Sequence, residues 1–380
     1  MWSPQRYLQK GKAKGVNTAV LAEAVKQISR LSAHSPPLPA VLSLPHLAWL
    51  SQTDLGVIRR YVSRENDDDY RRFYMKKRSG GYRRIGIPAE QLGRVQSWIA
   101  HNILARPAVH PASHAFQRGS SIVKCAAVHE NAKWMIKIDV ADFFGSITEI
   151  QVYRVFRSFG YNALISFEMS RICTDRLVKS AKYQLDSWKV HERERKIGDY
   201  SQKVLGRLPQ GAPTSPMLSN FAMLELDAQI AALAESAGLR YTRYSDDMTF
   251  STKDDFTRAA AVQFIAAVAG ILKKKGLYLN RAKTKIIPPG ARKIVLGLLA
   301  SGDFPALSKD FKAKLRQHIF YLQKYGITNH VEKRGFDSIG GLYRHLLGLI
   351  NFANMVEPLY ADSIRAQFDA LPWPGQLAVI

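Results

Sequence analysis

The sequence predicts an α+β fold in which an antiparallel sheet carries helices on one face. In the central section, segments with strand and helix patterns follow in the order strand, helix, helix, hairpin, helix and strand. This order is typical of an antiparallel sheet with helices packed on one side. The chain has 380 residues, more than one small core needs, so two or three subdomains are expected.

The first part of the chain combines a basic start, a hairpin and an amphipathic helix. Residues 1–44 hold the basic stretch QKGKAKG, a predicted helix near 18–31 and a proline-rich linker. From Tyr70 to Pro88, two basic runs of strand type are joined by Ser-Gly-Gly, which predicts a hairpin with cations on both arms. The next segment, EQLGRVQSWIAHNIL, has apolar residues at helical spacing.

The central section begins with KWMIKIDV, an apolar strand at 133–140 that ends in an aspartate and is followed by a turn and a helix. A charged insertion at about 176–205 comes next, and we expect a solvated extension there, with a partner surface as the alternative. The loop LPQGAPTSP then begins a helix with Leu226 and Ile230 on one face. A later helix ends in three lysines, which favours a buried helix over a membrane span. Its expected buried residues are Val262, Ile265, Val268 and Leu272.

The charge of the chain indicates a polyanionic partner. Lysine and arginine outnumber acidic residues 55 to 31, the net charge is +24 and the pI is about 10.0. Nucleic acid is the first candidate for such a partner. A basic membrane-surface protein is the alternative, but the chain lacks a run of roughly 18 apolar residues and an N-terminal signal pattern. Cys125 and Cys173 form no metal-ligand spacing, which favours a reduced, cytoplasmic protein with no membrane partner.

Two adjacent aspartates interrupt the strand-like stretch LRYTRYSDDMTFST at 239–252. Ser-Asp-Asp is ordinary turn chemistry, so a plain hairpin is one explanation. A sheet that pairs this hairpin with the strand ending in Asp139 would instead gather Asp139, Asp246 and Asp247 at one edge. Such a site, without His or Cys, indicates Mg²⁺, and two ions about 3.5–4 Å apart would suit phosphoryl transfer. Three unrelated surface acids remain the alternative.

Six motifs, taken together, resemble the reverse transcriptase family. YSDD is similar to the Tyr-x-Asp-Asp motif of these enzymes, IDVADFF to their first catalytic motif, and LPQGAPTSP to the loop beneath the incoming nucleotide. KKRSGGYRRI resembles a fingers motif, LNRAKTKI the segment after the palm helix, and KIVLGLLAS the primer grip. The motifs occur in the family's order over about residues 70–300. The resemblance implies an RNA-directed DNA polymerase with a right-hand fold of fingers, palm and helical thumb.

The resemblance also implies domain limits. A thumb that contains HLLGLINFA follows the palm, and the charged insertion 176–205 falls within the fingers. The expected limits are an N-terminal extension at 1–44, fingers at 45–134 and 150–216, palm at 135–149 and 217–300, and thumb at 301–380.

Within the palm, the resemblance assigns catalysis and the binding of two Mg²⁺ ions to Asp139, Asp246 and Asp247. Asp142 is instead expected to be a turn or helix-cap residue. Phe144 matches the aromatic position that blocks a ribose 2′-hydroxyl and so selects deoxynucleotides, with a core phenylalanine as the alternative.

The basic hairpin matches the part of the fingers that binds the dNTP triphosphate. Arg83 and Arg84 resemble the cations that hold it, since a guanidinium binds phosphate oxygens in a bidentate way. Lys76 and Lys77 are weaker candidates and are expected to contact nucleic acid. A solvated basic hairpin that touches template phosphates is the alternative for all four.

Two further motifs supply nucleotide contacts. Gln210 and Gly211 match the loop beneath the nucleotide, where a glycine would let the backbone approach the base or sugar. Lys283 matches the lysine expected to protonate pyrophosphate as it leaves, and its neighbour Lys285 could be confused with it.

Other residues are expected to bind nucleic acid outside the catalytic centre. Gly297 falls in the primer-grip turn. His129 lies in a region that resembles an RNA-contacting motif, but a buried structural histidine is an equal alternative. Four cations that crowd the start of a thumb helix are expected to contact the duplex backbone: Lys309, Lys312, Lys314 and Arg316.

The compact length resembles the retron group of bacterial reverse transcriptases. The resemblance implies a structured non-coding RNA template, a branched RNA–DNA product (msDNA) primed from a guanosine 2′-hydroxyl, and an effector protein in anti-phage defence. Two departures weaken the subtype: CAAVH stands where the group has Asn-Ala-x-x-His, and Val-Leu-Gly where it has Val-Thr-Gly. A reverse transcriptase of another bacterial system and an RNA-binding scaffold that restrains a toxin are the alternatives.

Overall fold

The strand predicted at 133–140 forms β3 (Trp134–Asp139), which lies inside a four-stranded sheet of order β4-β5-β3-β6. The computed structural model describes residues 3–64, 69–77, 80–176 and 205–374. The other strands are β4 (Arg240–Tyr244), β5 (Asp247–Thr252) and β6 (Lys285–Ile287), and every pair is antiparallel. The register places Asp139 directly opposite Asp247. The predicted antiparallel sheet is confirmed.

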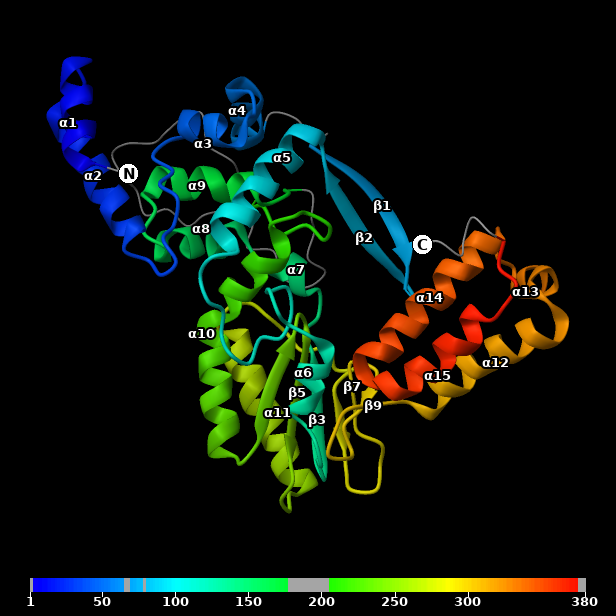
Figure 1. The fold of residues 1–380 in the computed structure, drawn as a ribbon. Coiled ribbons are helices and arrows are strands. Elements are labelled where there is room, and N and C mark those ends of the chain that lie inside the picture. The colour runs from blue at the N-terminus through cyan, green and yellow to red at the C-terminus, as the bar shows by residue number, and fades with distance from the viewer. Residues whose placement is uncertain (1–2, 65–68, 78–79, 177–204, 375–380) are drawn as a thin grey trace.

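One face of this sheet is buried beneath two helices, as Figure 1 shows. These helices are α10 (Ser215–Ser236) and α11 (Arg258–Lys273). Directly opposite residues in an antiparallel pair point to the same face, so Ile136 and Phe250 both point toward the helices. The ring of Phe250 packs on that of Phe264 of α11, with centroids 4.9 Å apart. The other face therefore carries Asp139 and Asp247.

The buried face of α11 differs in part from the prediction. Val262 is 54% exposed, and the fully buried row is Ala261, Phe264, Val268 and Leu272. The bulky Phe264 sets the rotation of the helix, so the row that includes Val262 turns toward solvent. Leu226 and Ile230 of α10 are buried as predicted.

The basic hairpin consists of β1 (Tyr70–Lys76) and β2 (Tyr82–Pro88), as the sequence predicts. The predicted helix after it is α5 (Glu90–Ile99), which continues as the π-helix η1 (Ala100–Leu104). Most of the charged insertion lies outside the described residues. Further helices surround the hairpin and α5 or follow them in the chain. They are α1 (Pro4–Ala13), α2 (Thr18–Ser32), α3 (Leu44–Ser51), α4 (Leu55–Ser63), α6 (Ile122–Ala127), α7 (Phe143–Ser146), α8 (Glu149–Ser158) and α9 (Ala163–Ile172).

The C-terminal part is helical and packs around a second core, which also includes Cys125 and Met135. A small three-stranded sheet comes first, with β7 (Ile294–Val295), β8 (Leu298–Leu299) and β9 (Ala306–Leu307). Figure 1 shows the helices that follow as a separate group beside β7 and β9. Buried apolar side chains such as Leu315, Leu346 and Phe368 hold this group together. The helices are α12 (Lys309–Tyr325), α13 (Ile327–Arg334), α14 (Ile339–Val356) and α15 (Pro358–Asp369).

Across the described part of the chain, none of the helices combines the length and the apolar character needed to span a bilayer.

Candidate active site

The three predicted carboxylates come together at the end of β3 and the turn between β4 and β5. Tyr244 pairs with Asp247, so Ser245 and Asp246 form a two-residue hairpin turn. The amide of Val140 donates a hydrogen bond of 3.0 Å to the carbonyl of Asp246, which ties this turn to the end of β3. Asp139 faces Asp247 across the two strands. Residues more than a hundred positions apart therefore share one edge of the sheet, as predicted.

The carboxylates crowd one another in a half-buried place. Burial raises the pKa of Asp246 and of Asp247, and the negative charge of nearby Asp139 raises both further. Two lysines partly compensate. The ammonium of Lys283 lies 2.8 Å from Oδ2 of Asp139, and that of Lys137 lies 3.1 Å from Oδ2 of Asp247.

These residues suit a hard divalent cation by the chemistry of their donors. Within the described ranges, no three ligating side chains converge on one point as they stand. However, the nearby groups are carboxylate oxygens, the ligand type that Mg²⁺ prefers. Burial is the first cause of the raised pKa values, with the charge of Asp139 as a further one, so ionised carboxylates are costly at this place. A bound divalent cation would stabilise their ionised form.

A cleft of about 760 Å³ opens over Asp139 and Asp246, and Asp247 is not among its lining residues. It is lined by residues from the hairpin, the end of β3, the loop before α10 and the segment before β6. The predicted site residues among them are Lys77, Arg83, Arg84, Asp139, Phe144, Gln210, Asp246 and Lys283. Lys285, the alternative to Lys283, lies on β6 opposite Lys137. The chain thus brings acidic and basic groups predicted from separate motifs to one cavity.

The hairpin separates the two predicted arginines. Neighbouring residues of a strand point to opposite faces, so Arg83, opposite Met75, and Arg84, opposite Tyr74, project on different sides. Arg84 shares its face with Arg72, which also lines the cleft. The Arg72 guanidinium holds Asp175 through both carboxylate oxygens, at 3.0–3.2 Å. The face with Arg84 is therefore anchored toward the cleft.

The loop with Gln210 and Gly211 packs against this hairpin. The amide of Gly86 donates to the carbonyl of Gln210 at 2.8 Å. Gly211 has a φ of +116°, and a Cβ there would lie 2.9 Å from the carbonyl oxygen of Gly86. The close approach to the backbone of β2 gives this position a structural reason to be glycine, and the expected approach to a nucleotide base or sugar stays a prediction.

An aromatic group forms one wall of the cleft. Phe144 is half-buried, with its ring centroid 5.5 Å from that of Phe143 and 6.3 Å from that of Phe116. Phe116 was not predicted, because it lies in a coil segment without periodicity. It has a φ of +65°, is 39% exposed and also contacts Tyr244. Asp142 occupies the N-cap position of α7 with a φ of +46°, in keeping with the expected cap role.

His129 is a buried structural residue. It is fully buried, and its Nδ1 and Nε2 each lie 2.7 Å from a hydroxyl, of Ser251 and Thr242 respectively. Burial lowers the pKa of the imidazole to about 3, so the ring is neutral at pH 7. A side chain without exposed surface cannot touch RNA, and this corrects the nucleic-acid assignment of His129 in favour of its alternative.

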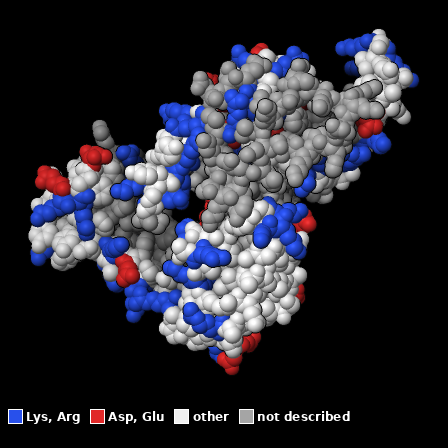
Figure 2. Space-filling model, turned by 180° about the vertical axis from the view of Figure 1, so that it is seen from behind, with Lys and Arg blue, Asp and Glu red and all other residues white. Residues whose placement is uncertain are grey.

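The remaining predicted residues lie toward the C-terminal part. Leu296 and Gly297 form the β7–β8 turn, and both have positive φ, at +49° and +87°, as a type I′ turn requires. Lys312 binds Glu357 and lies over the ring of Tyr360, so it is engaged within the protein. The other predicted cations of α12 (Lys309, Lys314 and Arg316) are exposed, as is Lys76 of the hairpin. Figure 2 shows Lys and Arg spread over the rear face, with Asp and Glu in small groups.

Two residues near the carboxylates escaped the sequence prediction but carried a signal. Lys137 stands two positions before Asp139, so strand alternation puts both on one face. Asn280 stands in the motif LNRAKTKI, lines the cleft, and its amide donates to the carbonyl of Asp139 at 2.7 Å.

Comparison with known proteins gives a family for this site. Residues 75–316 match the family described as "Reverse transcriptase (RNA-dependent DNA polymerase)". The chain is 30% identical to the Retron Mx162 reverse transcriptase of Myxococcus xanthus, over 87% of this chain and 65% of that enzyme. It is 31% identical to the Retron Ec86 reverse transcriptase of Escherichia coli, over 75% of this chain and 79% of that enzyme.

Among solved structures, a foamy viral protease–reverse transcriptase in complex with double-stranded DNA matches 82% of this chain and 42% of its own, with a TM-score of 0.42 and 15% identity. The sequence matches are the informative ones, because they extend over most of the chain at about 30% identity. The chain belongs to the reverse transcriptases, the RNA-directed DNA polymerases, and is of the retron type.

Proposed function

We propose that the cleft is the site of DNA synthesis on an RNA template, with Asp139, Asp246 and Asp247 as the ligands of two Mg²⁺ ions. The observation that carries this proposal is that one cavity is lined by Asp139, Asp246, Lys283, Arg83 and Arg84. An acidic cluster beneath a basic rim suits a substrate that brings a triphosphate and metal ions together.

The residues of the chain have distinct tasks in this proposal. Bound Mg²⁺ would activate the attacking hydroxyl and neutralise charge on the leaving oxygen. Arg84 and, from the other face of the hairpin, Arg83 both line the cleft, and they hold the triphosphate oxygens in this proposal. Lys283 is the proton donor to the departing pyrophosphate. Phe144, backed by Phe143, limits the space beside the sugar and so disfavours a 2′-hydroxyl.

The net charge of +24 supports binding of the template–product duplex outside the cleft. In this proposal Lys76, Lys77 and the exposed cations of α12 contact its phosphates, and Gly297 shapes the turn beside the primer. The parts of the right hand keep the limits expected from the motifs: fingers at 45–134 and 150–216, palm at 135–149 and 217–300, and thumb at 301–380.

We further propose the retron reaction itself. The template is a dedicated structured RNA, synthesis begins at a guanosine 2′-hydroxyl, and the product is a branched RNA–DNA. An effector protein encoded nearby would complete a system of anti-phage defence. The relatives named as retron enzymes over most of this chain support this part of the proposal.

The test is to purify the protein from its native locus with the nucleic acid that it carries. The double variant Asp246→Asn, Asp247→Asn is compared with wild type. A matched control is Asp254→Asn, Asp255→Asn, because this second acidic pair follows the opposite end of β5. We expect branched RNA–DNA with wild type and the control, and RNA alone with the first variant. RNA without DNA in all three would contradict the proposal and favour an RNA-binding scaffold.

A further inference from the structure

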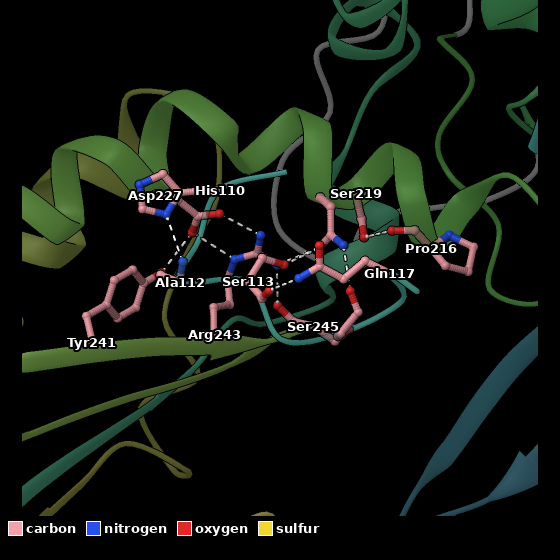
Figure 3. Close-up of polar contacts among 12 residues, drawn as sticks. His110, Ala112, Ser113, Gln117, Pro216, Ser219, Asp227, Tyr241, Arg243 and Ser245 are labelled. Carbon is pink, nitrogen blue, oxygen red and sulfur yellow. Dashed lines mark hydrogen bonds and ion pairs between the residues drawn. The ribbon is translucent and has the colours of Figure 1, made fainter. Parts of the chain in front are cut away.

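An ion pair without any exposed surface lies directly beneath the catalytic turn. Arg243 of β4 and Asp227 of α10 are both 0% exposed. The guanidinium donates from Nε to Oδ1 of Asp227 at 2.8 Å and from Nη2 to Oδ2 at 2.6 Å. The hydroxyl of Tyr241 adds a third hydrogen bond to this carboxylate, at 2.8 Å (Figure 3). Both oxygens of the Asp227 carboxylate thus accept hydrogen bonds from side chains of β4.

The remaining nitrogen of Arg243 reaches the turn itself. Its Nη1 donates to the carbonyl of Ser245 and to Oδ1 of Asn220, each at 3.1 Å. Ser245 has a φ of +60°, whereas Asp246 is not in this region, which is the pattern of a type II′ turn. Glycine is the usual residue at that first position, so a serine there is strained and needs support from its surroundings. Asp246 is the next residue in the chain.

The same network holds the segment that leads to Phe116. The amide of Arg243 donates to the carbonyl of Ala112 at 2.7 Å, and the amide of His114 donates back to the carbonyl of Arg243 at 2.8 Å. Asn220 accepts from the hydroxyl of Ser113 at 3.0 Å and donates to the carbonyl of Ala115 at 2.8 Å. Figure 3 shows these contacts running beneath α10. The segment before Phe116 is therefore held by the backbone of Arg243 and, through Asn220, by its guanidinium.

A purely structural ion pair would need only its two charges. A buried pair is often replaceable by apolar residues without loss of stability, so burial alone does not explain the arginine. Its fork can hold Asp227 with two nitrogens and the Ser245 carbonyl with the third, which the single nitrogen of a lysine cannot do. We propose that Arg243, held by Asp227, is a positioning residue that fixes the Ser245–Asp246 turn for catalysis. This inference rests on the proposed role of Asp246.

The test compares Arg243→Lys with Ile230→Ala. Arg243→Lys keeps the charge opposite Asp227 but gives up the contact with the turn. Ile230→Ala opens a cavity one turn further along α10, at a buried apolar side chain, and so destabilises the same helix without touching the network. The first readout is the melting temperature. The second is the affinity for Mn²⁺ without nucleotide or primer, measured from the electron paramagnetic resonance signal of free Mn²⁺. The third is kcat and KM for dTTP on poly(rA)/oligo(dT).

We expect Arg243→Lys to lose about tenfold or more in Mn²⁺ affinity and in kcat, with a smaller change in KM. Ile230→Ala should lower the melting temperature and leave Mn²⁺ affinity unchanged. Adding Ser245→Gly to Arg243→Lys should restore part of the affinity, because glycine adopts the positive φ without support. Tyr241→Phe removes one hydrogen bond to Asp227 and keeps the ion pair, so it serves as a milder variant if Arg243→Lys does not fold. A smaller loss of Mn²⁺ affinity is expected for it.

Mn²⁺ affinity equal to wild type in the folded variants of Arg243 and Tyr241 would overturn the inference. Asp246→Asn separates this result from failure of the proposed function. If Asp246→Asn abolishes both Mn²⁺ binding and synthesis while Arg243→Lys changes neither, the metal site stands and only the positioning role fails. If Asp246→Asn itself changes neither, the proposed site fails, and the inference fails with it.

Discussion

The ammonium of Lys283 and the carboxylate of Asp139 form an ion pair of 2.8 Å at the floor of the cleft. A positive charge is therefore already bound where a metal ligand is proposed. The pairing has two consequences: Lys283 competes with cations for Asp139, and its side chain is held in the cleft beside the carboxylates.

Replacing Lys283 by glutamine should separate these effects. We expect kcat for nucleotide addition to fall about 100-fold, the lower end of the usual range for loss of a general acid. Affinity for Mn²⁺ in the absence of nucleotide should stay the same or rise, because a competing cation is gone. Single-turnover kinetics and Mn²⁺ titration measure the two quantities. Lys285→Gln is the control, and an equal fall in kcat there would show that the wrong lysine is assigned.

Phe144→Ala should weaken the selection of deoxynucleotides. The Phe144 ring packs on Phe143 and Phe116 at one wall of the cleft, so its removal opens space there. We expect the preference for dTTP over UTP, as a ratio of kcat/KM values, to fall about 10- to 100-fold. Phe264→Leu, a core change far from the cleft, should reduce stability without changing the ratio. An unchanged ratio in Phe144→Ala would favour a plain core role.

Gly211→Ala and Gly238→Ala form a matched pair. Both glycines have positive φ, but a Cβ at Gly211 would meet the backbone of Gly86 at 2.9 Å, whereas nothing lies within 4 Å of one at Gly238. We expect Gly238→Ala to cost about 1 kcal/mol of unfolding free energy and Gly211→Ala about 1–3 kcal/mol more. Urea unfolding measures both. Only Gly211→Ala should also raise KM for dNTP, because it pushes the hairpin away from the loop. Equal losses of unfolding free energy in the two variants would mean that the loop moves away from Gly86 at little cost.

The order of elements along the central section and the meeting of the three aspartates could be predicted from the sequence because their signals are local. An apolar run marked β3, a strand-like run marked β4 and β5, and the Ser-Gly-Gly and Ser-Asp-Asp steps marked the two hairpins. Once those strands are paired, Asp139 and Asp247 have to meet.

Other contacts could not be predicted in this way, because they join segments distant in sequence. His129 finds its hydroxyl partners 113 and 122 positions away, and Phe116 meets Phe144 from a coil segment. The motif predicts that Gly211 approaches a nucleotide, but it could not show that the backbone of Gly86 also lies against this glycine, because that contact joins the loop to a distant hairpin.

His129 predicts a specific acid sensitivity. Burial lowers its folded-state pKa to about 3, below the unfolded value of about 6.5, so the unfolded chain takes up the proton first. The stabilisation is complete above pH 6.5 and is lost as pH falls toward 3, by up to about 1.4 kcal/mol per pH unit. In urea unfolding between pH 4.5 and 7.5, His129→Gln should lose less stability on acidification than wild type. Parallel curves would show that His129 does not carry this dependence.

The exposed cations of α12 should differ from Lys312 in how they affect duplex binding. Lys309, Lys314 and Arg316 point to solvent, whereas Lys312 is already bound to Glu357. Each phosphate contact that is removed should lower the slope of log affinity against log salt by about 0.9, because fewer counterions are released on binding. Alanine at all three exposed positions should therefore reduce the slope by two to three times this amount. Fluorescence anisotropy with a primer–template duplex at several salt concentrations measures the slope. Lys312→Ala should leave it almost unchanged. A larger change for Lys312 than for the other three would show that Glu357 gives up its partner to the duplex, and that the ion pair is only the resting arrangement of the helix.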